Sequence, residues 1–250
     1  MLGNPIGSKI IFLEETDSTN SYAARLIYDH TPIEGTVILA GFQNAGRGQR
    51  GSYWESVRDQ NLLVTYILFP SFLAASNHFF LNQALSLSMY EFIKSRTSEV
   101  VTIKWPNDIL AGNRKIAGLL VENTIRNNQF SYTLVGMGVN INQINFTGFS
   151  PEAVSLQLLE NKSFDLKTCL YELNQFVEKW YSILRTGNFK KISGEYSDAL
   201  FGLNLPVEFE SNQERFTASI KGVNQNGQLI LAGNNGKELI FNNKEVKFIF

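Results

Sequence analysis

The 250-residue chain has one cysteine, Cys169, and two histidines, His30 and His78. A single cysteine excludes a framework of disulfides and is compatible with a reducing compartment. Neither histidine has around it the spacing of a zinc site or of a Ser-His-Asp triad. Zinc chemistry and triad hydrolysis are therefore not expected.

Long apolar runs are also missing. The longest, LLVTYILF at 62–69, is far shorter than the roughly 20 residues that cross a bilayer, and no signal segment precedes the first strand pattern. The 22 basic and 23 acidic residues give a net charge of −1, without the basic run or tail that favours nucleic-acid binding. We expect a cytoplasmic protein that binds neither membrane nor nucleic acid.

The pattern of apolar residues predicts strands first and helices between them. Helices are expected at 18–29, 77–96 and 165–186, and strands at 9–14, 36–43, 61–69, 101–104, 108–111, 116–124 and 130–141. The core stripes of the two longer helices comprise Leu81, Leu85, Met89 and Phe92, and Leu166, Leu170, Leu173, Val177, Trp180 and Leu184. After about Leu200, short strand-like runs are separated by Asn and Gly. The sequence thus predicts a large domain over 1–198 and a small β-barrel-like domain over 199–250.

The stretch AGRGQRGSYWES at 45–56 is rich in glycine and arginine. Its spacing Gly46-x-Gly48-x-x-Gly51 matches a Rossmann fingerprint, but the loop leads into a strand and has no carboxylate twenty residues later. Kinase and Walker motifs are absent too. Glycine backbone together with Arg47 and Arg50 suits a phosphate or carboxylate, while a tight turn with solvated arginines is an equal alternative.

Three further segments favour a ligand-binding loop over a simple turn. KWPNDIL at 104–110 and RKIAGLLVE at 114–122 combine lysines with an Asn-Asp pair, and GMGVNIN at 136–142 allows a flat ligand close to the backbone. Together with the glycine-rich loop, they suggest one pocket that binds an apolar acid next to a nucleotide.

With DSTN at 17–20 added, these motifs resemble those of biotin protein ligases. The resemblance implies an α+β fold: a mixed β-sheet with packed helices, similar to class II synthetases, followed by an SH3-like barrel. It also implies a reaction in two steps. Biotin and ATP, with Mg²⁺, give biotinyl-5′-AMP, and a lysine of a biotin carboxyl carrier domain then accepts the biotin. A homodimer is a further possibility.

The resemblance also implies roles for individual residues. The catalytic group comprises Lys115, Arg47, Asp108 and Lys104, with Asp108 as a Mg²⁺ ligand. The biotin-binding group comprises Ser18, Thr19, Asn20, Gln43, Gly46, Arg47, Lys115, Gly118, Gly136 and Gly138. The nucleotide-binding group comprises Arg47, Gln49, Arg50, Gly51, Trp54, Lys104, Asn107 and Asn140.

One position departs from the family pattern. The family often has arginine at the position of Gln49, where it is thought to retain the reactive adenylate, so a neutral amide there predicts weaker retention. The DNA-binding domain of bifunctional members is not expected before the first strand. Two alternatives stay open: a lipoate-protein ligase, although neither histidine lies near the glycine-rich loop, and an inert module that binds biotin or its adenylate.

Overall fold

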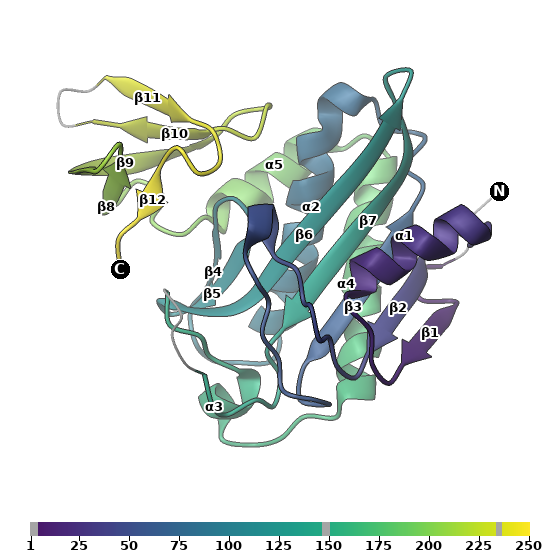
Figure 1. The fold of residues 1–250 in the computed structure, drawn as a ribbon. Coiled ribbons are helices and arrows are strands. Elements are labelled where there is room, and N and C mark those ends of the chain that lie inside the picture. Colours follow the sequence, from purple (N-terminus) through teal and green to yellow (C-terminus); the bar gives the residue numbers. More distant parts are fainter. Residues whose placement is uncertain (1–4, 147–150, 234–236) are drawn as a thin grey trace.

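The computed structural model describes residues 5–146, 151–233 and 237–250, which form two β-sheets and the helices that cover them (Figure 1). The larger sheet has seven strands in the order β1-β2-β3-β7-β6-β5-β4. Their bounds are β1 Ile10–Leu13, β2 Thr36–Ala40, β3 Leu62–Leu68, β4 Val101–Lys104, β5 Asp108–Ala111, β6 Arg114–Arg126 and β7 Gln129–Val139. Every predicted strand is present, although β2 ends before Gly41 because the chain turns there into the glycine-rich loop.

The large sheet is mixed, which confirms the predicted fold class. β1 pairs parallel to β2, and the other neighbours pair antiparallel. β6 and β7 form a hairpin whose turn residues, Asn127 and Asn128, have left-handed φ values of 50° and 59°. Asparagine tolerates this conformation better than most residues, so the two asparagines favour the turn there.

Helices cover both faces of the large sheet (Figure 1). One face carries α2 (His78–Lys94), α4 (Leu166–Arg185) and α5 (Phe189–Asp198), and most of the apolar core lies beneath them. The other face carries α1 (Thr19–Asp29), which packs on a smaller cluster that includes Ile38, Ile67 and Leu134. Because α1 is short, it leaves much of its face of the sheet open for a site.

The predicted stripes of α2 and α4 are buried, except that Leu166 at the start of α4 is only partly buried. Two helices were not predicted: α3 (Leu156–Glu160) and α5. α3 has too few residues to show a period, and α5 contains Gly194, which lowers helix propensity. Short 3₁₀ turns at η1 (Gln49–Gly51) and η2 (Ala75–Asn77) complete this part.

The C-terminal strands form a second sheet beside the β4 edge (Figure 1). Its order is β11-β10-β9-β8-β12, with bounds β8 Pro206–Ser211, β9 Glu214–Val223, β10 Leu229–Ala232, β11 Glu238–Phe241 and β12 Lys247–Phe248. The predicted boundary at 198/199 coincides with the end of α5. Residues after it still attach to the large sheet, because Ile103 donates to the Ala199 carbonyl and Phe201 donates back to Ile103.

Across the residues that the structure describes, no helix is both long and apolar enough for a membrane crossing.

Candidate functional site

A cavity of about 220 Å³ opens on the α1 face of the large sheet, beyond the helix. Side chains alternate between the two faces of a strand, and on this face β6 and β7 carry Gly118, Gly136 and Gly138. Gly118 and Gly138 are direct cross-strand partners. The absence of side chains at these positions makes a hollow in the sheet, which is the floor of the cavity.

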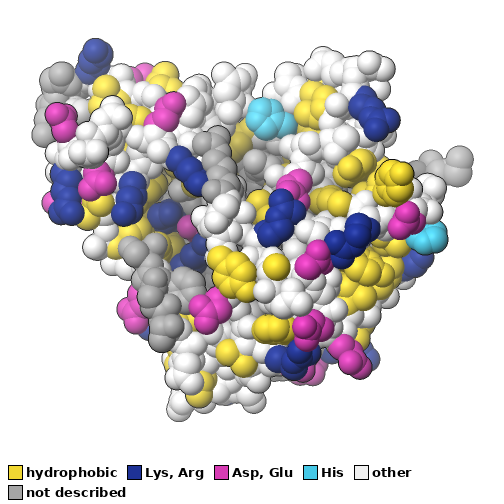
Figure 2. Space-filling model, viewed as in Figure 1, with side chains coloured by type: hydrophobic (Ala, Val, Ile, Leu, Met, Phe, Trp, Pro, Cys, Tyr) yellow, Lys and Arg dark blue, Asp and Glu magenta, His cyan; other side chains and the backbone are white. Residues whose placement is uncertain are grey.

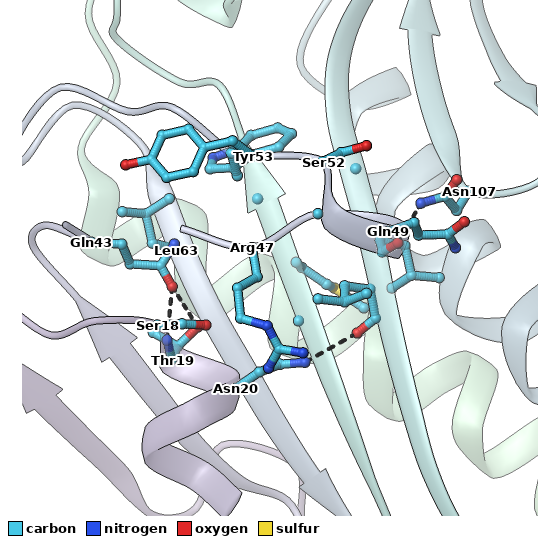
Figure 3. Close-up of a pocket in the computed structure, with 18 of the residues that line it drawn as sticks. Ser18, Thr19, Asn20, Gln43, Arg47, Gln49, Ser52, Tyr53, Leu63 and Asn107 are labelled. Atoms are coloured by element: carbon cyan, nitrogen blue, oxygen red, sulfur yellow. Dashed lines mark hydrogen bonds between the residues drawn. The ribbon is translucent and has the colours of Figure 1, made fainter. Parts of the chain in front are cut away.

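One end of the cavity is a buried polar cluster at the start of α1 (Figure 3). The side-chain oxygen of Gln43 accepts hydrogen bonds from the Thr19 amide (2.7 Å) and the Thr19 hydroxyl (3.0 Å). Ser18, at the N-cap of α1, lines the same end. Beneath them, the Thr65 hydroxyl lies 2.8 Å from Thr19 Oγ1 and 2.6 Å from Asn20 Oδ1. This network fixes the directions of the polar groups that face a ligand.

A carboxylate connects this end to the glycine-rich loop. Glu122 on β6 accepts from Asn20 Nδ2 at 2.8 Å and forms an ion pair with Arg47 at 2.6 Å. The Asn20 side chain also lies over Gly136, where a Cβ atom would come within 2.6 Å of Asn20 Oδ1. The bare face of Gly136 thus accommodates Asn20. A direct contact between Gly136 and biotin stays a prediction.

The glycine-rich loop is a hairpin that reaches over the cavity. Trp54 donates to the Gly46 carbonyl at 3.0 Å, and Gly48 donates to the Ser52 carbonyl at 2.7 Å. Gln49–Gly51 form the tip, where Gly51 has a φ of 84°. Gly46 needs its missing side chain for this hairpin, because a Cβ atom there would lie 2.3 Å from the Trp54 carbonyl oxygen.

Trp54 packs from this hairpin onto the glycine floor. A Cβ atom on Gly138 would lie 2.4 Å from the indole ring, and one on Gly118 would lie 3.1 Å from it. Lys115 Nζ lies 5.5 Å from the centroid of the same ring, within the range of a cation–π contact. The two glycines therefore serve first as the seat of Trp54.

Replacing Gly138 with alanine should expel Trp54 from this seat, because no Cβ contact of 2.4 Å is tolerated. Since the other two tryptophans, Trp105 and Trp180, are almost fully buried, quenching of tryptophan emission by acrylamide should rise. Gly194→Ala is the control: nothing lies within 4 Å of its added Cβ. Equal quenching of Gly138→Ala and wild type would contradict this packing.

Asp108 on β5 stands between two lysines. Lys115 Nζ lies 2.6 Å from its Oδ1, and Lys104 Nζ lies 3.3 Å from its Oδ2. Burial raises the pKa of Asp108, but the two ammonium groups outweigh this effect and hold the pKa below its ordinary value. Asp108 is therefore ionised at neutral pH and orients Lys115 at the cavity wall.

A second, smaller cavity of about 70 Å³ adjoins the first at Trp54. It is lined by Asn140, Phe146, Ala153 and Glu55, together with Tyr53, Trp54 and Lys115, which also line the first cavity. The Asn140 amide is fixed at this place because it donates to the Val154 carbonyl at 3.1 Å. The two cavities therefore meet at Lys115 and the aromatic pair.

Most of the predicted site residues come together here, and a few do not. Gly46, Gly51 and Lys104 do not line the first cavity, and Lys104 instead lines a third cavity beside the C-terminal strands, with its ammonium 5.0 Å from the Phe248 ring centroid. Asn107 is at the expected wall, where its side-chain nitrogen donates to the Leu119 carbonyl at 2.5 Å. The Arg50 side chain lies outside the described part of the structure.

Several lining residues were not predicted from the sequence. The apolar wall comprises Leu63, Val64, Leu119, Leu120 and Met137. The other additions are Gly48, Ser52, Tyr53 and Lys244 on the wall, and Thr65 and Glu122 behind it. Tyr53 stands beside Trp54 in the sequence, which could have revealed it. Lys244 comes from the C-terminal domain, and no local pattern indicates where that domain packs.

The fit of Mg²⁺ to Asp108 can be tested against this geometry. Mg²⁺ in proteins usually binds one or two carboxylates together with substrate phosphates. Both oxygens of Asp108 are paired with ammonium groups, and the described residues contain no group of three or more His, Cys, Asp or Glu side chains that could hold a metal. Asp108 therefore does not fit as a metal ligand in this arrangement.

Comparison with known proteins identifies relatives that cover nearly the whole chain. The model of the Biotin/lipoate A/B protein ligase family matches residues 12–140. A biotin–[acetyl-CoA-carboxylase] ligase of Paracoccus denitrificans is 30% identical over 237 residues, covering 91% of this chain and 96% of the relative. The bifunctional ligase/repressor BirA of Bacillus subtilis is 25% identical, covering 94% of this chain and 73% of that protein.

The fold has close counterparts among solved structures. The biotin protein ligase from Aquifex aeolicus, in complex with biotin and ATP, superposes with a TM-score of 0.80. The superposition covers 97% of this chain and 99% of that one at 24% sequence identity. The arrangement of the sheets and helices is therefore shared with that structure.

Proposed function

This chain belongs to the biotin/lipoate A/B protein ligase family. We propose that biotin and ATP bind in its two cavities, where biotin is first joined to AMP and then transferred to a carrier protein. In the first step, a carboxylate oxygen of biotin attacks the α-phosphorus of ATP. The new P–O bond forms biotinyl-5′-AMP as the bond to the β-phosphate oxygen breaks, and pyrophosphate leaves. In the second step, a lysine amine of the carrier attacks the anhydride carbonyl. An amide forms, the amine loses a proton, and AMP leaves.

The observation that supports this proposal most is the place of Lys115. It lines both cavities, and Asp108 fixes its ammonium group at 2.6 Å. With biotin in the first cavity and the adenine in the second, the carboxylate and the α-phosphate would meet at that ammonium. A cation that is already positioned there stabilises the charge that develops during adenylation.

The polar end of the first cavity supports biotin over lipoate as the acid. The ureido ring of biotin carries both donors and an acceptor, which suit the fixed hydroxyl and amide groups of Ser18, Thr19 and Gln43. The dithiolane ring of lipoate has no comparable hydrogen-bonding groups. It would leave the remaining donors and acceptors of these buried groups without a ligand partner, and such a mismatch is costly for a site built to hydrogen-bond its substrate.

The charges on the wall suit an anionic intermediate. Among the described residues that line the first cavity, Arg47, Lys115 and Lys244 are cationic, and Asp108 is the carboxylate. On the face shown in Figure 2, Lys and Arg side chains lie at the hollow between the two domains. Arg47 now pairs with Glu122, and an adenylate phosphate would compete with that carboxylate for its guanidinium.

The proposal extends to partners and cofactors. The acceptor is a lysine of a biotin carboxyl carrier domain, and Mg²⁺ accompanies ATP, held by the phosphates of the nucleotide rather than by Asp108. No step here depends on a protein ligand to the metal. The cytoplasmic location and the homodimer stay predictions.

Exchange of labelled pyrophosphate into ATP tests the first step. The protein should catalyse exchange that depends on biotin, because adenylation is reversible while the adenylate stays bound. Lipoate should support little or no exchange. Exchange with lipoate alone would make the protein a lipoate ligase, and exchange with neither acid would make it an inert binding module.

A further inference from the structure

The tip of the glycine-rich hairpin is bonded to the C-terminal domain. Asn243 donates from its side-chain amide to the side-chain oxygen of Gln49 at 2.7 Å, across 194 positions of sequence. Gln49 is the residue at which the family often has arginine. Here the tip is therefore attached to the protein through a bond between two neutral side chains.

The segment that presents Asn243 is itself held in place. Glu245 accepts from the backbone and side-chain amides of Asn242, at 2.6 and 3.0 Å, and Gln228 donates to the Asn242 side chain at 3.1 Å. The next residue, Lys244, has a left-handed φ of 74°, a conformation that a lysine rarely adopts. Backbone strain of this kind persists only where surrounding contacts hold it.

This segment also reaches the site, because Lys244 lines the first cavity and Asn243 and Lys244 both line the third. The C-terminal domain is in turn fixed to the large sheet, since the Trp105 indole donates to the Gly227 carbonyl at 2.9 Å. In Figure 1 the short dark-blue turn at the tip of the hairpin lies between β6 and the C-terminal strands. The bond thus connects the tip of the hairpin to the C-terminal domain beside the first cavity.

We propose that Asn243 is a positioning residue that holds the tip of the hairpin closed through Gln49, and so sets how long biotinyl-5′-AMP stays bound. This role rests on the proposed function. The base of the hairpin is held separately, by the Arg47–Glu122 pair and by Trp54 on its glycine seat. Loss of the bond at the tip should therefore let the tip of the hairpin open more often, while the residues that form the binding surface keep their places.

A double-mutant cycle on the release of biotinyl-5′-AMP tests this role. Asn243→Ala and Gln49→Ala should each speed release by roughly three- to tenfold, the range expected for one neutral hydrogen bond. The double variant should be no faster than either single variant, because both remove the same bond. The biotin affinity of Asn243→Ala should stay near that of wild type, and Thr217→Ala, an exposed position on β9, is the control. Unchanged release in Asn243→Ala, or two effects that multiply in the double variant, would overturn the proposal.

A second measurement does not depend on the proposed function. Trypsin can cleave after Arg47 and Arg50, and cleavage requires the hairpin to open. In the protein without ligand, Asn243→Ala should raise the rate of cleavage within residues 47–51 several-fold, whereas Thr217→Ala should not. If the wild-type protein forms no adenylate, the proposed function fails, and this measurement still decides the role of Asn243. An unchanged cleavage rate would overturn it.

Discussion

A Lys115→Ala variant should fold and bind biotin, yet form biotinyl-5′-AMP at least about a hundredfold more slowly than wild type. Removal of one pre-positioned group that stabilises developing charge typically costs about 10²- to 10³-fold in rate. Biotin affinity should fall much less, because the polar end of the cavity at Thr19 and Gln43 does not involve Lys115. Single-turnover formation of the adenylate is the measurement.

Lys190→Ala is the matched control for this loss, since Lys190 is exposed on α5, away from both cavities. It should form the adenylate at the wild-type rate. Near-normal synthesis by Lys115→Ala would show that Lys115 does not act at the reacting centre. There would then be no reason to place the carboxylate and the phosphate at the junction of the cavities.

An Asp108→Ala variant should be less stable than wild type by about 3 kcal/mol at neutral pH. The substitution leaves Lys104 and Lys115 without their shared carboxylate, and Lys104 is only 13% exposed. Urea unfolding followed by circular dichroism measures the difference. Asp29→Ala, at an exposed carboxylate at the end of α1, should change stability by less than about 0.5 kcal/mol.

The stability difference between wild type and Asp108→Ala should depend on pH in a defined direction. Because the folded-state pKa of Asp108 is lower than its ordinary value of 3.8, ionised Asp108 stabilises the fold fully above that value. The contribution is lost as the pH falls through the lowered folded-state pKa. The difference should therefore be constant between pH 5 and 8 and narrow only below about pH 4. Equal stability of the two proteins at pH 7 would contradict the buried ion pairs.

Much of the fold follows from local patterns in the sequence. The stripe from Leu81 to Phe92 predicted α2 because burial on one face imposes the helical period. α5 was missed because Ile192 and Tyr196 are its only fully buried residues and Gly194 interrupts it. One pair of buried residues, four positions apart, is too short a pattern to predict a helix.

The site was predictable where its chemistry lies in short motifs, as at Lys115, Asp108 and Arg47. The sequence did not show why a particular residue type stands at a given position of the site. Gly138 is a glycine in order to seat Trp54, a contact between residues 84 positions apart. Thr65 on β3 belongs to no motif, and Glu122 ends the RKIAGLLVE segment without any local sign of its pairing with Arg47, so only the assembly of the large sheet reveals their places. Lys244 reaches the cavity only through the packing of the C-terminal domain.

A crystal structure of the protein with biotinyl-5′-AMP bound tests the central claim most directly. The predicted complex has the ureido ring against Thr19 and Gln43, the adenine in the second cavity beside Asn140, and the phosphate within hydrogen-bond distance of Lys115 Nζ. A complex with the adenine in the first cavity, or with the phosphate far from Lys115, would contradict the account.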